Sequence, residues 1–168
     1  MLAKKLCFTG CANDLHDKAL PAQKAEMNLV FPGNALAVRR ALKASMVGLR
    51  HLDLSQDEKG VVEIVLAEVL NNIVEHAYDD THTGVIELTV SRQDDDLIFL
   101  VLDDGLPLPE AKVPAGAAHN LNTPTSDLPE GGFGWFLIKQ LTRNLSYQRS
   151  GNRNRLSFSI ALKDTQSF

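Results

Sequence analysis

The 168-residue sequence lacks several features that mark particular classes of protein. Its apolar stretches, such as 97–102, are far shorter than the roughly 20 residues that a membrane helix needs. The first six residues carry two lysines, but no long apolar core follows them, so we expect no export signal and a cytoplasmic location. The formal net charge of -4 gives no general attraction to nucleic acid.

Cysteine is scarce, with Cys7 and Cys11 close together near the start of the chain. Their spacing can be half of a metal site, but no second cysteine or histidine pair at metal-binding spacing accompanies them. We therefore expect reduced thiols in a flexible N-terminal arm over 1–24. Hydrophobic residues make up 44% of the chain and charged residues 23%, which is ordinary for one globular domain of this length.

Hydrophobic periodicity predicts a domain over 25–163, followed by a short tail over 164–168. Alternation and apolar runs predict strands over 26–31, 85–91, 97–102, 145–149 and 154–162. Apolar residues at three- and four-residue steps predict helices over 34–49, 58–78 and 134–143. This order predicts a two-layer α/β sandwich, with a mixed, mainly antiparallel sheet and helices on one face.

A long segment over 107–133 shows no convincing period and holds five of the seven prolines. Loops of this length are usually either functional or disordered, so an unstructured insertion is the alternative to a functional loop. Its position between two of the motifs described next favours the functional interpretation.

The first motif lies on the second predicted helix. Steps of four residues drift by only about 40° around a helix, so Glu68, Asn72 and His76 form one polar stripe beside the apolar face. An asparagine carbonyl is a hard oxygen ligand that suits magnesium, and a carboxylate can accept a hydroxyl proton. A solvent-exposed helix face is the alternative interpretation.

The second motif follows the apolar run 97–102. Asp103 emerges from a buried strand, where a carboxylate is costly unless it has a partner such as the amino group of adenine. Gly105 would let the backbone turn closely past a base. Taken alone, Asp103-Asp104-Gly105 is more typical of an ordinary turn.

The third motif is the glycine-rich segment 130–134, which leads directly into the short helix. Backbone N–H groups around Gly132 and Gly134 then face the same space as the helix N-terminus, which makes a sound anion site. A simple turn before a helix is the alternative.

In this order, the three motifs resemble the histidine-kinase-like ATPase superfamily, whose fold is of the Bergerat type. The likeness is greatest to the anti-sigma serine kinases. It rests on the string Glu68-x3-Asn72-x3-His76-Ala-Tyr78 and on the string from Leu145 to Leu156. It covers roughly residues 26–162.

The resemblance implies ATP and Mg²⁺ as cofactors and a lid over about 107–131 that closes on the nucleotide. The implied roles are Glu68 as general base, Asn72 as magnesium ligand, Asp103 as adenine-binding carboxylate with Gly105 beside it, Gly132 and Gly134 as phosphate-loop glycines, and His76 near the nucleotide. The resemblance also implies a homodimer that binds a sigma factor and phosphorylates a serine of an anti-anti-sigma (STAS-type) protein.

Two departures from the family pattern keep other functions open. Pro107 stands where many superfamily members have a second glycine, and Lys112 is the one basic residue of the lid over 107–130. A lid with so little positive charge offers little to neutralise a γ-phosphate. A non-catalytic, ATP-gated binding module is therefore one alternative, and the detached catalytic domain of a two-component sensor kinase is another.

The last part of the chain is unusually basic. Between 131 and 163 there is no Asp or Glu, whereas the segment contains Lys139, Arg143, Arg149, Arg153, Arg155 and Lys163. This segregation predicts either a basic patch on the last hairpin that meets an acidic partner, or cations that guard strand edges.

Overall fold

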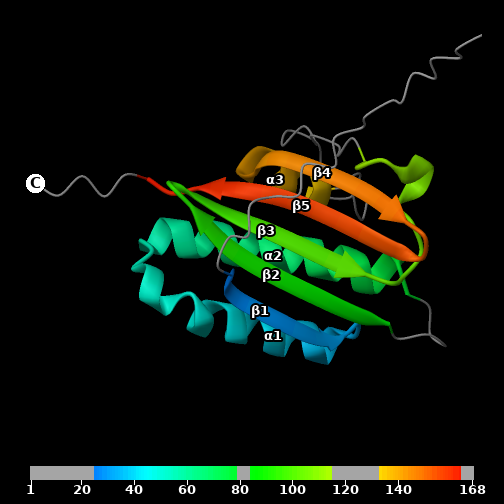
Figure 1. The fold of residues 1–168 in the computed structure, drawn as a ribbon, viewed down its shortest axis with the longest axis horizontal. Helices are drawn as coiled ribbons and strands as arrows, with labels where there is room; N and C mark the ends of the chain where they lie inside the picture. The colour runs from blue at the N-terminus through cyan, green and yellow to red at the C-terminus, as the bar shows by residue number, and fades with distance from the viewer. Residues whose placement is uncertain (1–24, 79–83, 115–132, 164–168) are drawn as a thin grey trace, which may run out of the picture.

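The structure is a computed structural model that describes residues 25–78, 84–114 and 133–163 (Figure 1). The predicted arm over 1–24, most of the predicted lid with Gly132, and the tail over 164–168 lie outside the described residues. Residues 79–83, between the second predicted helix and the second predicted strand, also lie outside them. None of the described helices is both long and apolar enough to cross a membrane.

The predicted helices and strands are all present. In chain order they are β1 (Ala25–Pro32), α1 (Ala35–Gly48), the 3-10 turn η1 (Arg50–Leu52), α2 (Gln56–His76), β2 (Val85–Gln93), β3 (Asp96–Asp103), the 3-10 turn η2 (Pro109–Ala111), α3 (Phe133–Leu141), β4 (Arg143–Ser150) and β5 (Arg153–Ala161). Helix α3 ends two residues earlier than predicted. The Thr142 hydroxyl donates to the Ile138 carbonyl at 2.6 Å, and β4 begins at the next residue.

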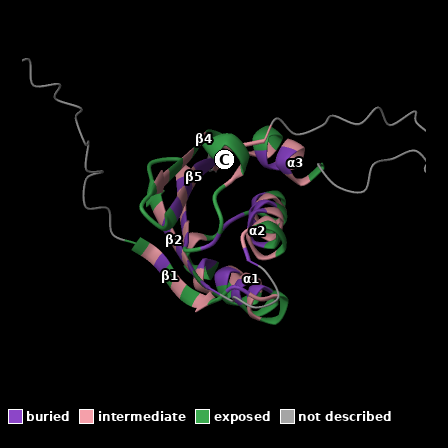
Figure 2. Ribbon diagram, turned by 90° about the vertical axis from the view of Figure 1, so that its right-hand side faces the viewer, coloured by how far each residue is buried: buried purple, intermediate pink, exposed green. Residues whose placement is uncertain are grey.

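The five strands form one sheet in the order β1-β2-β3-β5-β4, and all four pairings are antiparallel. Helices α1, α2 and α3 lie on one face of this sheet, which confirms the predicted two-layer sandwich (Figure 2). β3 is the central strand, between β2 and β5. The register between β3 and β5 places Asp103 directly opposite Asn154, a residue far away in the sequence.

The core fills the space between the sheet and α2. The inward residues of β2 and β3 are fully buried, namely Ile86, Leu88, Val90, Leu97, Phe99 and Val101. The rings of Phe99 and Phe158 stack with their centroids 4.9 Å apart, which joins β3 to β5. The predicted stripe on α2 is buried at Val62, Leu66, Val69 and Leu70, and Val65 is buried with them.

One side chain on β5 departs from the strand's alternation. Ser159 lies between the core residues Phe158 and Ile160, so alternation predicts that it faces away from the core, but only 1% of it is exposed. The register between β4 and β5 shifts between Arg143 and Ser146, with Asn144 at φ 54°. The Asn144 amide donates to the Ser159 hydroxyl at 3.3 Å, so this irregularity covers the serine.

Both long helices begin at a polar cap. The Asn34 side chain accepts from the Ala37 amide at 2.9 Å, as predicted for the start of α1. Helix α2 begins two residues earlier than predicted, because Ser55 and Glu58 form a reciprocal capping box. Glu58 also accepts from the Lys163 backbone amide at 2.7 Å, so it joins the start of α2 to the chain after β5.

We predict that Glu58→Gln lowers the free energy of unfolding by about 1–3 kcal/mol at neutral pH, the usual cost of weakening a buried charged hydrogen bond. Burial raises the pKa of Glu58, but its hydrogen bonds with Ser55 and Lys163 outweigh burial and hold the pKa below its ordinary 4.5. A lowered folded-state pKa adds stability above the ordinary pKa, and this stability disappears as the pH falls through the folded-state pKa.

Urea unfolding of both proteins over an acid series tests this prediction. The difference between wild type and variant should shrink as the pH falls below the ordinary pKa of the carboxyl. Glu63→Gln, at an exposed position of the same helix, is the matched control and should match wild type throughout. A difference that stays constant down to acid pH would contradict the assigned role of the charge.

Candidate functional site

A cavity of about 460 Å³ lies between α2, the end of β3 with the loop that follows it, and the start of α3. Of the predicted site residues, Asn72, His76, Asp103 and Gly134 line it. Glu68 lies beside it, because a Cβ atom at Gly134 would be 2.5 Å from Glu68 Oε2. The structure thus brings the α2 stripe and the β3 end, predicted separately, to one cavity.

The carboxylate of Asp103 forms one end of the cavity, and only 4% of the residue is exposed. Its Oδ1 accepts from the Gly105 backbone amide at 2.9 Å and from Asn154 Nδ2 at 2.7 Å. Burial raises the pKa of Asp103, while these two hydrogen bonds and the charge of Arg149 oppose the rise. None of the described residues donates to Oδ2, so this oxygen is available as an acceptor.

Gly105 does not line the cavity, so the expected turn of its backbone past a base does not explain the glycine. Its contact with the end of α2 does. A Cβ atom there would lie 2.6 Å from the Ala77 carbonyl oxygen, so a side chain would collide with the end of α2. The next residue, Leu106, donates its backbone N–H to the same carbonyl at 2.8 Å. The loop after β3 is therefore held directly against α2.

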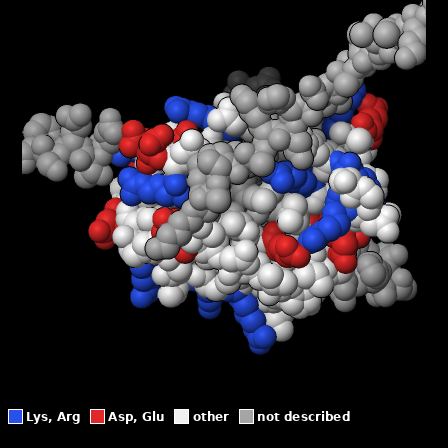
Figure 3. All heavy atoms as spheres, viewed as in Figure 1, with Lys and Arg blue, Asp and Glu red and all other residues white. Residues whose placement is uncertain are grey.

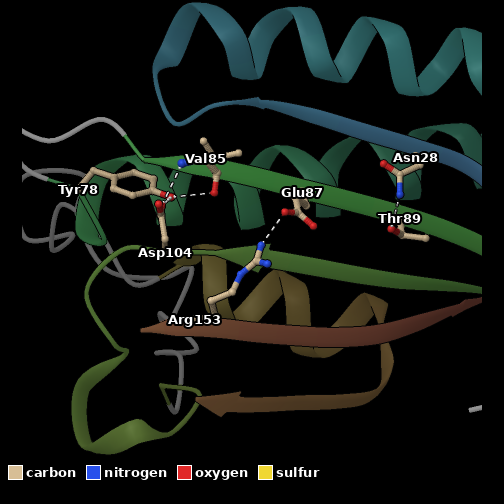
Figure 4. A network of polar contacts seen from close by, with 7 residues as sticks. All are labelled: Asn28, Tyr78, Val85, Glu87, Thr89, Asp104 and Arg153. Atoms are coloured by element: carbon tan, nitrogen blue, oxygen red, sulfur yellow. Dashed lines mark hydrogen bonds and ion pairs between the residues drawn. The ribbon is translucent and has the colours of Figure 1, made fainter. Parts of the chain in front are cut away.

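Tyr78, just beyond α2, joins the helix to the sheet (Figure 4). Its hydroxyl lies 3.0 Å from Asp104 Oδ1 and 3.3 Å from the Val85 carbonyl oxygen, and the Val85 amide donates to the same carboxylate oxygen at 3.0 Å. Gly84 has no room for a side chain because Asp104 and the tyrosine ring pack against it. Burial and Asp104 raise the pKa of Tyr78, so the phenol stays protonated. This junction joins the residue after α2 to the start of β2 and to the loop after β3.

The other end of the cavity combines Asn72 with the start of α3. Asn72 Nδ2 is buried and finds no hydrogen-bond partner among the described residues. A buried amide in this state is costly unless a ligand satisfies it, and its carbonyl is of the oxygen type that Mg²⁺ takes. The α3 N-terminus at Phe133–Gly134 carries the partial positive charge that favours phosphate groups. These donors fit a magnesium-bound phosphate chain.

Sequence reasoning missed three residues around Asp103, namely Tyr147, Arg149 and Asn154. Tyr147 and Asn154 line the cavity, and Arg149 donates to the Gly105 carbonyl at 2.9 Å. All three lie in segment 145–156, on which the family resemblance rests. The resemblance of this segment was therefore the sequence signal that could have indicated these residues. Their side-chain roles depend on the β3–β5 pairing, which the string alone does not reveal.

The prediction of a basic patch on the β4–β5 hairpin is wrong for its two central cations. Arg149 is directed into the Asp103 network, and Arg153 pairs with Glu87 at 2.7 Å (Figure 4). Beyond the hairpin, Lys163 lies 3.4 Å from Asp57. On the face that Figure 3 shows, cations and anions are interspersed rather than separated. The anions that pair with these cations come from earlier segments, so the local charge count did not predict them.

Comparisons with known proteins agree with this geometry. Residues 31–160 match the histidine kinase-like ATPase domain family. The serine-protein kinase RsbW of Bacillus mycoides (strain KBAB4) is 27% identical over 120 residues, which are 71% of this chain and 73% of the relative. The anti-sigma F factor of Bacillus licheniformis is 24% identical over 129 residues, 76% of this chain and 85% of the relative.

Among solved structures, the RsbU and RsbW domains of a Mycobacterium tuberculosis protein are similar in fold. The TM-score is 0.54 at 12% sequence identity. The match covers 81% of this chain but 32% of the solved one. At this identity the likeness supports the fold alone.

Proposed function

Because the chain belongs to the histidine kinase-like ATPase domain family, we propose that it is an anti-sigma regulatory factor with protein serine kinase activity. In this proposal it binds Mg-ATP and transfers the γ-phosphoryl group to a serine of an anti-anti-sigma, STAS-type partner, which controls the availability of a sigma factor. We further propose that it acts in the cytoplasm as a homodimer. The names of the two relatives described above support the regulatory role.

The observation that carries this proposal is the polarity of the cavity. One end presents the buried acceptor Asp103, and the other presents Asn72 and the start of α3. A nucleotide has the matching arrangement, with an amino group on the base at one end and anionic phosphates at the other. His76 lines the wall between them, and the apolar part of the lining includes Val69, Ile73 and Leu156.

The residues then have the following roles. Asp103 accepts a hydrogen bond from the amino group of adenine, and Asn72 holds Mg²⁺ through its carbonyl oxygen. Glu68, one helical turn before Asn72, takes the proton of the attacking serine hydroxyl as general base. Gly134 keeps the start of α3 close to Glu68, because any side chain there would meet this carboxylate. The bound Mg²⁺ neutralises phosphate charge, and the protein contributes positioning, as in phosphoryl transfer generally.

Affinity capture tests the function directly. We expect the purified chain, used as bait in the native cytoplasm, to retain a sigma factor and an anti-anti-sigma protein when Mg-ATP is present. The isolated anti-anti-sigma protein should then gain one phosphate on serine, measured by mass spectrometry. If the partner is held only with ATP but gains no phosphate, the chain is an ATP-gated binding module instead. Retention of a response regulator would favour a sensor-kinase domain.

We predict that Asn72→Ala removes the magnesium dependence of nucleotide binding. The variant lacks the carbonyl ligand, so its ATP affinity in Mg²⁺ should fall to the level measured in EDTA. Its stability without nucleotide should not fall, because the substitution also removes a buried amide that no described residue satisfies. Calorimetric titration with and without Mg²⁺ measures both affinities.

The matched control is Asn71→Ala, at the exposed neighbouring position of the same helix. It should keep the full response to Mg²⁺. A magnesium response that survives in Asn72→Ala would remove Asn72 from the metal site, while leaving the base-binding end of the cavity untouched.

A further inference from the structure

The outer face of the sheet, on the side away from the helices, is apolar along its central strand. On β3 the residues that alternate with the core are Ile98, Leu100 and Leu102, and all three are only partly buried. None of the described helices lies on this side of the sheet (Figure 2). A strand with one face in solvent normally alternates apolar and polar residues, whereas a nearly continuous apolar run is typical of a strand covered on both faces. The composition of β3 is therefore that of a strand with a cover on its outer face.

The strands beside β3 present polar side chains on the same face, and these bond to one another. The Asn28 amide donates to the Thr89 hydroxyl at 3.1 Å, and Arg153 pairs with Glu87 at 2.7 Å (Figure 4). Single apolar side chains on a surface are normal, whereas a contiguous apolar patch indicates a contact site. Ile98, Leu100 and Leu102, here named the β3 strip, form the contiguous apolar part of this face.

One end of the β3 strip borders a hollow of about 540 Å³. Asp94, Asp95 and Asp96, at the turn between β2 and β3, line it together with Ile98. Arg143 is the one cation among the described residues that line this hollow. Three carboxylates beside one guanidinium leave this end of the strip negative. The surface thus suits a segment that carries positive charge next to apolar side chains.

The arm over 1–24, which lies outside the described residues, has this combination in its sequence. Lys4 and Lys5 stand directly before Leu6-Cys7-Phe8. With four lysines and two aspartates, the arm has a net charge of +2 with histidine neutral, in a chain of net charge -4. Side chains two residues apart share one side of an extended segment, so Leu6 and Phe8 can contact the strip together while Cys7 points away.

The place where the arm joins the sheet allows this contact. Ala25, the first residue of β1, pairs with Ser91 of β2, and Ser91 pairs with Ile98 of β3. Ala25 and Ile98 therefore share one row of the sheet two strands apart, which is about 10 Å at the usual strand spacing. The 16 residues over 9–24 can span about 50 Å when extended, so the apolar part of the arm reaches the strip.

We propose that segment 4–8 of the arm packs on the β3 strip, with Leu6 and Phe8 against its apolar side chains and with Lys4 and Lys5 beside the acidic turn. Helices then cover one face of the sheet and this segment covers the other. Only a short segment has to be ordered, which limits the entropy that the contact costs. A partner that binds this face must displace the segment.

Paramagnetic broadening in the full chain tests the proposal. A nitroxide attached to Cys7, in a chain that carries Cys11→Ser, lies above the β3 strip if the segment packs there. The methyl signals of Ile98 and Leu100 should then lose intensity. The methyl signals of Ile64, which is exposed on α2 behind the sheet, should keep most of theirs. Intensity that is lost at Ile64 rather than at the strip would overturn the proposal.

Substitutions in the arm test which side chains make the contact. Leu6→Ser combined with Phe8→Ser should restore the signals of the β3 strip, because the segment then has no apolar side chains to bury there. These changes leave every described residue as it is, so the fold of the sheet is not at risk. Leu15→Ser combined with Leu20→Ser, in the same arm but outside segment 4–8, is the matched control and should keep the broadening. Equal broadening in both double variants would overturn the proposed contact.

Charge reversal tests the role of the acidic turn. Lys4→Glu combined with Lys5→Glu should restore part of the signal intensity, because it places negative charge beside Asp94, Asp95 and Asp96. Lys18→Glu, at a lysine outside segment 4–8, is the control and should leave the broadening as in wild type. An equal effect of both changes would contradict the placement of segment 4–8 beside this turn.

A mixed sample separates this contact from one between two copies of the chain. Isotope-enriched chain without nitroxide is mixed with unenriched chain that carries it, so only a contact between copies broadens the strip. Full broadening in the mixture would overturn packing within one chain and would assign the face to a second copy. If neither sample shows broadening, and the strip signals shift only when a sigma factor or anti-anti-sigma protein is added, the face belongs to that partner and the proposal is wrong. The samples contain no ATP, so failure of this inference leaves the proposed nucleotide binding and phosphate transfer unchanged.

Discussion

Glu68→Gln is expected to slow phosphate transfer to the partner serine by about 10²-fold or more, the usual scale for loss of a general base. Glu68 lies one helical turn before Asn72, with Oε2 next to the start of α3. A substrate hydroxyl must lose its proton near this point if Asn72 holds magnesium on the phosphates. Glutamine keeps the shape of the side chain but removes its charge and basicity.

The same variant should bind ATP equally well or slightly better, because it removes a negative charge beside the triphosphate. This combination of unchanged affinity and slower transfer distinguishes a catalytic group from one that only binds. The measurement is single-turnover transfer of labelled phosphate at saturating ATP, beside a titration of ATP affinity. Glu75→Gln, at an exposed position of the same helix, is the control and should transfer phosphate at the wild-type rate.

Two outcomes would contradict the catalytic role. Transfer at the wild-type rate in Glu68→Gln would assign the proton to another acceptor. If wild type holds its partner only with ATP and transfers no phosphate, no serine hydroxyl gives up a proton and Glu68 is not a general base. The chain is then a nucleotide-gated binding module.

Asp103→Asn is expected to remove most of the stabilisation that ATP gives the folded protein. At about a hundredfold excess over the dissociation constant, a ligand specific for the folded state adds about 2.7 kcal/mol. If the variant binds about a hundredfold more weakly, the same ATP concentration adds only about 0.4 kcal/mol. The reason is geometric, because the Gly105 and Asn154 donors hold the oxygen of the new amide. Its N–H₂ group then faces the amino group of adenine.

Thermal unfolding with and without Mg-ATP measures this effect as a difference in the shift of the melting temperature. Asp104→Asn is the matched control, since Asp104 bonds to Tyr78 and Val85 rather than to the cavity. It is expected to lower the melting temperature without nucleotide and to keep the ATP-induced shift. If wild type shows no shift with ATP, ADP or a non-hydrolysable analogue, the proposed nucleotide binding is wrong.

Much of the fold could be predicted because its signals are local. Side chains two residues apart share a strand face, and those three or four apart share a helix face, so periodicity located each helix and strand. Local polar pairs also set helix starts. The Ser55–Glu58 capping box is visible in the sequence, although the predicted start of α2 was two residues late.

The candidate site could be predicted in part for the same reason. Glu68, Asn72 and His76 share one side of α2 because of helical geometry, and Asp103 ends an apolar strand. These properties do not depend on the rest of the molecule. The sequence by itself therefore determined the chemical groups of the two ends of the cavity.

Only the tertiary structure decided which groups meet. The strand order β1-β2-β3-β5-β4 sets Asn154 beside Asp103, and no local pattern specifies that register. It also turns Arg149 inward, toward the Gly105 carbonyl, although its charge alone suggested a surface patch. The partner of a buried polar group depends on strands far apart in the chain. The amide that orients the carboxylate thus became identifiable only after the sheet had been assembled.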